Sequence, residues 1–293
     1  MPAPETVQPA PGVDDPVVAA VLDWWTANAR PLPWRASRDV YAIWVCEVMS
    51  AQTTVGRCVE AWSAWMERWP RVEDLAAASL AEVLVQWQGL GYPRRARDLH
   101  RSARIVVASG WPADLTALPG VGPYVAAAVR CFAREEPVLP RDVNVQRVLR
   151  RRLPHGVDTS GDPWRAGQAL MEFGQRVCAT RPRCEACPVS EGCPGPAPGP
   201  DPGRAPGPTP EPGPTPEPGP APGPGSGPGS RAAPARRPGR RFEGSLRQRR
   251  GRLLARVLAE GRTTIGEEDR KAAAGLAADG LAVLTGDVLR PPA

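Results

Sequence analysis

The chain has 293 residues, and 42% of them are hydrophobic, which is enough to bury the core of at least one domain. Its 38 prolines and 30 glycines exceed what one compact domain uses, so we expect an extended segment. The net charge of +6 fits a polyanionic partner. No stretch reaches the roughly 18 consecutive apolar residues of a membrane span, and no secretory signal is visible at the start. We therefore expect a cytoplasmic, nucleoid-associated protein of bacterial type without a membrane partner.

Composition divides the chain into four parts. Residues 1–13 predict a disordered tail, and residues 14–193 show dense helix-period patterns. Residues 194–240 predict a disordered Pro/Gly-rich linker, because repeats such as PTPEPGP cannot bury apolar area. Residues 241–293 predict a small basic helical module of unknown role, with two helices followed by a short hairpin.

Helical spacing dominates residues 14–193, where strand-like alternation is rare. Trp62, Trp65 and Trp69 share one face of a predicted helix, and residues 80–87 predict a second amphipathic helix. Prolines separate these segments, as helix breakers do. The pattern predicts an all-α domain of about ten helices.

A tight hairpin is predicted at Leu-Pro-Gly-Val-Gly, where Gly120 and Gly122 allow the backbone to turn sharply. Pro123 then occupies a favoured first position of the next helix. Exposed amides at such a helix start bind phosphate groups. A plain helix–helix turn is the alternative, since the GxG pattern alone is weakly specific.

A four-cysteine cluster closes this part of the chain. Cys178, Cys184, Cys187 and Cys193 have the spacing C-x5-C-x2-C-x5-C, and in a reducing compartment such a group favours a metal centre over disulfides. A [4Fe-4S] cluster and a structural zinc ion both fit four thiolates at close spacing. The sequence spacing leaves both open.

Together these motifs resemble the helix-hairpin-helix DNA glycosylase superfamily over residues 17–193. Its iron–sulfur branch contains endonuclease III-like lyases and MutY-type adenine glycosylases. The resemblance implies two helical lobes, a [4Fe-4S] cluster in the loop 178–193, and double-stranded DNA as the partner of a monomer. The matching stretches, in chain order, are Leu32-Pro33-Trp34-Arg35, Glu47-Val48-Met49, Gly89-Leu90-Gly91-Tyr92, Gly120-Val121-Gly122-Pro123-Tyr124 and Asp142-Val143-Asn144-Val145.

The absence of a lysine nucleophile distinguishes between the two enzyme types of this branch. The lyases of this family carry a lysine nucleophile where Tyr124 stands, and a phenol cannot form the Schiff base that an amine forms. The only lysine of the sequence is Lys271, beyond the predicted linker. The resemblance therefore implies a monofunctional glycosylase that uses water.

Two carboxyl groups are the candidate catalytic pair, as in glycoside hydrolysis. Glu47 lies within an apolar helical stretch, so partial burial is expected to raise its pKa; a helix-edge ion pair is the alternative. The resemblance implies that Glu47 protonates the adenine ring and later helps activate water. It also implies that Asp142 stabilises the sugar cation, with Asn144 and Tyr124 supporting it. An ordinary N-cap would explain Asp142 equally well.

Further positions match the DNA-binding residues of the family. Arg30, Trp34 and Gln168 match residues around the adenine pocket, and Gln52 and Tyr92 match residues that wedge into the duplex and probe the opposite base. Ordinary packing or capping is the alternative for each.

Three features depart from the MutY pattern. Ser50-Ala51-Gln52 resembles the endonuclease III side, and the first cysteine spacing is one residue shorter than usual. Residues 241–293 are too few for the C-terminal domain that reads 8-oxoguanine, so the chain resembles a short form of the family.

We therefore expect an adenine DNA glycosylase of base excision repair that removes adenine mispaired with 8-oxoguanine or guanine. A thymine or uracil mismatch glycosylase is the enzymatic alternative, and Glu47 favours adenine. A non-catalytic DNA-binding iron–sulfur protein is the other alternative, and it would not need both Glu47 and Asp142.

Overall fold

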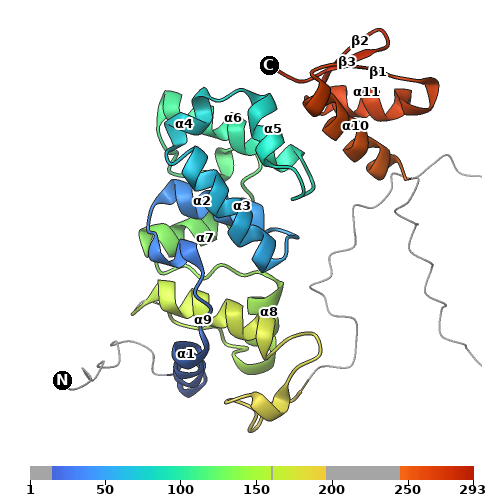
Figure 1. Cartoon of the computed structure of the whole chain (residues 1–293). Coiled ribbons are helices and arrows are strands. Elements are labelled where there is room, and N and C mark those ends of the chain that lie inside the picture. The colour runs from blue at the N-terminus through green and yellow to red at the C-terminus, as the bar shows by residue number, and fades with distance from the viewer. Residues whose placement is uncertain (1–14, 160, 196–244) are drawn as a thin grey trace, which may run out of the picture.

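The computed structural model describes residues 15–159, 161–195 and 245–293. The predicted tail, and nearly all of the predicted linker, lie outside these described residues. Figure 1 shows an elongated arrangement, with α1, α8 and α9 at one end and the C-terminal module beside α5 at the other. Among the described helices, none is long and apolar enough to cross a bilayer.

The expected all-α fold of the main domain is confirmed. Nine α-helices lie within the described residues 15–195. They are α1 Pro16–Asn28, α2 Val40–Ser50, α3 Val55–Arg68, α4 Val72–Ala77, α5 Leu80–Gln86, α6 Arg94–Ser109, α7 Pro123–Arg134, α8 Val143–Arg152 and α9 Pro163–Arg176.

Side-chain capping defines many of the helix starts. Asp15, Asp39, Asp142 and Asp162 each accept a hydrogen bond from a backbone amide of the first turn that follows them. Ser79 forms a reciprocal capping box with Glu82. Prolines stand at the first position of α1, α7 and α9, where the missing amide is not needed.

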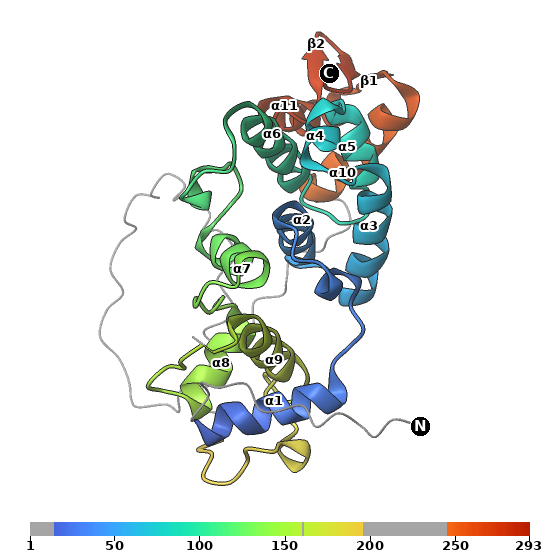
Figure 2. The same ribbon diagram turned by 90° about the vertical axis from the view of Figure 1, so that its left-hand side faces the viewer.

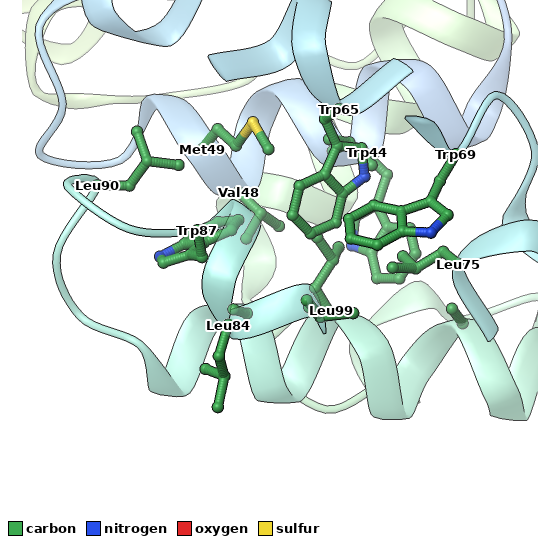
Figure 3. Close-up of a cluster of buried hydrophobic side chains, with 14 of the residues drawn as sticks. Trp44, Val48, Met49, Trp65, Trp69, Leu75, Leu84, Trp87, Leu90 and Leu99 are labelled. Carbon is green, nitrogen blue, oxygen red and sulfur yellow. The ribbon is translucent and has the colours of Figure 1, made fainter. Parts of the chain in front are cut away.

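Two lobes share the main domain. One lobe packs α1 against α8 and α9, so the first helix of the chain lies beside much later ones (Figure 2). The second lobe contains α2 to α7 around a tryptophan-rich core (Figure 3). There the Trp65 indole donates to the Tyr41 hydroxyl at 3.0 Å, and that hydroxyl donates to the Trp69 carbonyl, also at 3.0 Å. These two bonds satisfy the Trp65 indole and the Tyr41 hydroxyl inside the core, whereas the buried Trp44 indole nitrogen has no hydrogen-bond partner among the described residues.

The C-terminal module is a mixed unit: α10 Leu246–Glu260, β1 Thr263–Thr264, α11 Arg270–Ala278, β2 Val283–Thr285 and β3 Val288–Arg290. The strands form an antiparallel sheet in the order β1-β3-β2. The two predicted helices and the hairpin are confirmed. The sequence analysis missed β1, because a two-residue strand produces no readable alternation.

A buried ion network joins α1 and α9 to the segment that leads into the second lobe. The Glu172 side chain is only 1% exposed, and its carboxylate accepts from Arg30 Nε at 2.6 Å and Arg35 Nη2 at 2.7 Å. Arg176 and the Trp25 indole complete its partners. Burial acts to raise the pKa of Glu172, but the Arg35 and Arg30 guanidinium groups outweigh it and hold the pKa low.

We predict that Glu172→Gln lowers the free energy of unfolding by about 3 kcal/mol, because it removes the buried charge that pairs with the partly exposed Arg30, Arg35 and Arg176. Chemical denaturation at neutral pH measures the change. The control is Glu135→Gln, which breaks the exposed pair with Arg38 and should cost less than about 1 kcal/mol. Equal effects of the two variants would contradict the structural role of Glu172.

Candidate active site

Glu47 lies in the middle of α2, the helix whose residues from Tyr41 to Met49 are all buried. Its side chain faces α7, where the Tyr124 hydroxyl donates to Glu47 Oε2 at 2.8 Å. The expected partial burial is confirmed, since Glu47 is 7% exposed. No basic partner of its carboxyl is found among the described residues, so the helix-edge ion pair does not form.

Burial raises the pKa of Glu47 to about 7; the Tyr124 hydrogen bond opposes the rise, and the negative charge of Asp142 adds to it. The carboxyl therefore holds a proton over much of the range near neutral pH. Burial, followed by the charges of Glu47 and Asp142, also raises the pKa of Tyr124, so its phenol remains a hydrogen-bond donor. Glu47 can thus deliver a proton to a buried base, the property of a general acid.

Asp142 caps α8, and its carboxylate accepts from the backbone amides of Asn144 and Val145 at 2.9 and 2.7 Å. The Asn144 side-chain amide donates to the other carboxylate oxygen at 2.6 Å. A methyl group on Gly174 of α9 would lie 2.7 Å from the Asn144 carbonyl oxygen, so the glycine permits close packing of α8. The Asp142 side chain is therefore the N-cap of α8, and these hydrogen bonds hold the candidate catalytic carboxylate in one orientation.

The predicted hairpin forms between α6 and α7. Gly120 has φ of +76°, and a Cβ there would lie 2.9 Å from Asp98 of α6, so both backbone conformation and packing require glycine. The Ser102 hydroxyl donates to the Pro119 carbonyl at 2.9 Å and holds the turn. Gly122 is the N-cap of α7 and has no side chain to cover the helix amides. These amides suit a phosphate group.

Gln52 and Tyr92 lie in two loops and share an uncommon backbone conformation. Their φ values are +57° and +48°, and only one other described non-glycine residue, Glu135, has a positive φ. Positive φ in non-glycine residues concentrates at functional sites because surrounding structure must hold it. Tyr92 is 41% exposed, as a residue that wedges into a duplex must be.

Arg95 of α6 ties these two loops together, a role that the sequence analysis missed. Its guanidinium donates to the carbonyls of Val48 and Ala51 at 2.6 and 2.8 Å, and to the Leu90 carbonyl at 3.0 Å. It also lies 5.6 Å from the centre of the Tyr92 ring. One of several arginines in a row carries no sequence signal for such a role.

A small pocket of about 90 Å³ opens beside Glu47. Its walls come from α2, α6, the hairpin and the start of α7, and Arg95, Asp98 and Gly120 are among the residues that line it. The hairpin and the loop-tying arginine therefore border the same space as the buried acid.

Of the three predicted adenine-pocket residues, Arg30 and Gln168 lie in the Glu172 network and Trp34 does not. Arg30 pairs with Glu172, and Gln168 accepts from Arg35 Nε at 2.9 Å. The Trp34 ring packs edge-on against Trp62 with ring centres 5.9 Å apart. Their contact with a base stays a prediction.

The four cysteines lie on the loop that follows α9, drawn in yellow in Figure 1. Cys178 is buried, and Arg151 donates to its Sγ at 3.4 Å. Burial raises the pKa of the Cys187 thiol; a backbone hydrogen bond from Val189 opposes the rise, and the charges of the other three cysteines add to it. Within the described residues no three side chains reach metal-ligand geometry. The donor chemistry suits a cluster that completes its own geometry on binding.

Known proteins match the main domain. The family model described as HhH-GPD superfamily base excision DNA repair protein matches residues 45–163. The adenine DNA glycosylase of Mycolicibacterium smegmatis is 42% identical over 58% of this chain and 66% of its own length. That of Homo sapiens is 40% identical over 58% of this chain and 37% of its own length. The matches thus span less than two thirds of these relatives.

Solved structures agree on the fold. A thermostable thymine-DNA glycosylase superposes with a TM-score of 0.54 at 28% identity, over 60% of this chain and 93% of its own. An endonuclease III–DNA covalent intermediate gives a TM-score of 0.51 at 22% identity, over 60% of this chain and 92% of its own. The order of motifs, the hairpin geometry and the family match agree. Residues 45–163 are therefore similar to the HhH-GPD superfamily of base excision DNA repair proteins, and the fold of the main domain agrees with that similarity.

Proposed function

We propose that this protein is a monofunctional adenine DNA glycosylase. The observation that carries the proposal is the Glu47 carboxyl, which is buried and accepts a hydrogen bond from Tyr124, and whose pKa burial raises to about 7. A buried neutral acid is what departure of adenine requires, because the ring must gain a proton to leave as a neutral base. The 42% identity to an adenine DNA glycosylase supports the same substrate.

The reaction follows from the positions of two carboxyl groups. The target adenine is first extruded from the duplex. Glu47 transfers its proton to a ring nitrogen, the bond between the base and C1′ breaks, and its electron pair leaves with adenine. Asp142 stabilises the positive charge that develops on the sugar. Ionised Glu47 then accepts a proton from the attacking water, which leaves an abasic sugar and restores the acid.

The absence of an amine near Glu47 supports hydrolysis without strand cleavage. Tyr124 stands at the position where the related lyases carry lysine, and Lys271 lies on α11 in the C-terminal module. Without an amine nucleophile, no Schiff base forms at C1′.

Double-stranded DNA with adenine opposite 8-oxoguanine or guanine is the proposed partner of a monomeric, cytoplasmic enzyme. The hairpin amides at Gly122 and the exposed Tyr92 ring supply a phosphate contact and a wedge. Gln52 lies in the adjoining loop, from which it would probe the opposite base.

We propose a [4Fe-4S] cluster on Cys178, Cys184, Cys187 and Cys193. When bound, such a cluster supplies cross-linking of the loop by metal–thiolate bonds. The Arg151 contact to Cys178 would stabilise thiolate charge. Zinc is the alternative ion for the same donors.

A single-turnover assay with four duplexes tests the activity: A·8-oxoG, A·G, T·G and A·T, each with and without alkali. We expect adenine loss from the first two, with strand breaks only after alkali. Thymine loss from T·G would identify the alternative mismatch glycosylase. The structural similarity to a thymine-DNA glycosylase is the reason for including this duplex. Absence of excision from all four would contradict both.

We predict that Glu47→Gln slows excision by about 100-fold or more while duplex affinity is retained, because an amide cannot donate the acid proton. Single-turnover rates and fluorescence anisotropy measure the two properties. Glu60→Gln makes the same chemical change on the exposed face of α3 and serves as control. Unchanged excision by the Glu47 variant would remove this residue from the mechanism.

We predict that wild-type excision declines as pH rises through about 7, where Glu47 loses its proton. In Tyr124→Phe this decline should move to higher pH, because the lost hydrogen bond had favoured the ionised form. Single-turnover rates across pH measure both midpoints. Tyr41→Phe, within the tryptophan core, should leave the midpoint in place; an unmoved midpoint in the Tyr124 variant would refute the assigned coupling.

We predict that Cys187→Ser abolishes stoichiometric iron and acid-labile sulfide in the purified protein. Elemental and sulfide analyses measure both. Cys131→Ser is the matched control, since its buried Sγ bonds to the Pro163 carbonyl and lies outside the cluster loop. Zinc in place of iron and sulfide would identify the alternative ion.

A further inference from the structure

The C-terminal module is fixed to the main domain by a buried carboxylate. Asp279, at the end of α11, has a side chain that is 8% exposed and pairs with Arg94 of α6 and Arg250 of α10. Burial acts to raise its pKa, but hydrogen bonds from these two guanidinium groups hold the pKa low. Arg97 also donates to the Asp279 backbone carbonyl.

Apolar packing and one backbone bond extend this attachment. Leu253, Leu254 and Val257 of α10 belong to the same buried cluster as the core of the second lobe. The Leu80 amide donates to the Ala293 carbonyl at 3.2 Å. Figure 1 shows the module beside α5, away from α1 and the cysteine loop. The module therefore presents one defined face next to the second lobe.

The start of α10 lies against the predicted wedge. The Arg247 guanidinium is 4.4 Å from the centre of the Tyr92 ring, a cation–π contact between residues far apart in the chain. Since the Tyr92 ring is also partly exposed, a duplex that meets Tyr92 would meet Arg247. This contact gives the module a position at the proposed DNA surface.

Positive charge in the first turn of α10 is unfavourable for the helix dipole, whose N-terminal end is itself positive. This turn contains no acidic residue, although acidic side chains are the stabilising choice there. Arg247 and Arg252 are exposed, and no carboxylate of the described residues forms an ion pair with either. Arg247 contacts the Tyr92 ring and Arg252 donates to Gln248, but no carboxylate of the described residues neutralises either charge, which fits an external anion.

Gly251 separates these two arginines on the helix surface. It is exposed, and a Cβ there would meet nothing within 4 Å. By helical rotation, Gln248, Gly251 and Ala255 lie between Arg247 and Arg252; Gly251 and Ala255 leave the surface low there, and the Gln248 side-chain carbonyl accepts from Arg252 Nη2 at 2.6 Å. Glycine within a helix costs about 1 kcal/mol relative to alanine.

We propose that the face of α10 formed by Arg247, Gly251 and Arg252 binds the phosphate backbone of duplex DNA beside the Tyr92 wedge. This inference rests on the proposed function for its DNA substrate. It assigns to the C-terminal module a contact outside residues 45–163, the part that the family model matches.

Salt dependence of binding tests the proposal on the full chain. Each lost phosphate contact reduces the slope of log K against log salt by about 0.9, so Arg247→Gln with Arg252→Gln should reduce it by about 2. The control is Arg262→Gln with Arg290→Gln; Arg262 follows the end of α10, whose last residue Glu260 lies about 20 Å from Arg247 by the rise of 1.5 Å per residue. Anisotropy with fully paired and A·G duplexes measures both slopes.

A second pair of variants avoids loss of any native contact. Gly251→Glu and Gly251→Gln both place a long side chain in open space with better helix propensity. We expect Gly251→Glu to weaken binding about tenfold more than Gly251→Gln, with equal thermal stability, because only the carboxylate repels phosphate.

The outcomes separate the two proposals. If wild-type protein binds duplexes but the arginine pair keeps the wild-type slope and both Gly251 variants bind alike, the α10 face is not a DNA surface. If wild-type protein excises no adenine yet the slopes change as expected, the enzyme assignment fails and the DNA contact stands. A change of slope in the control pair as large as in the Arg247 and Arg252 pair would also overturn the proposal.

Discussion

The burial of the Glu47 carboxyl is the constraint on which the site depends. Moving its pKa from 4.5 to about 7 means that the native state holds this proton more tightly than the unfolded chain does. Stability therefore falls as pH rises between these values, by about 3 kcal/mol in total. The tryptophan core around α2 offsets this loss through large apolar burial (Figure 3). The raised pKa of Glu47 makes a proton available near neutral pH, and it also makes the native state less stable as pH rises.

Arginine side chains connect loops and helices of the described residues that are far apart in the sequence. Arg95 holds the loops of Gln52 and Tyr92 through several backbone carbonyls, and its five fixed donors make that possible. Two buried carboxylates connect distant segments in the same way, because Glu172 and Asp279 each pair with more than one guanidinium group. Such paired charges stabilise only when both signs are present, so each set joins helices into one geometry.

The C-terminal module packs against the second lobe through Asp279, which pairs with Arg94 of α6 and Arg250 of α10. Arg247, in the first turn of α10, lies over the Tyr92 ring and brings positive charge to that loop. Non-specific phosphate contacts position a protein on a duplex without reading sequence. The phosphate contacts proposed for α10 would therefore add affinity for duplex DNA beside Tyr92.

The sequence by itself determined the helical class, the hairpin with Gly120 and Gly122, and the partial burial of Glu47, because these depend on local periodicity, turn geometry and neighbouring apolar residues. The N-cap role of Asp142 was also readable from its place before a helix. Tertiary structure alone decided which side chains meet. The Tyr124 contact to Glu47, the hold of Arg95 on two loops and the position of Arg247 over Tyr92 join distant parts of the chain. Helix packing sets such contacts through side-chain shape and burial, and no local pattern encodes them.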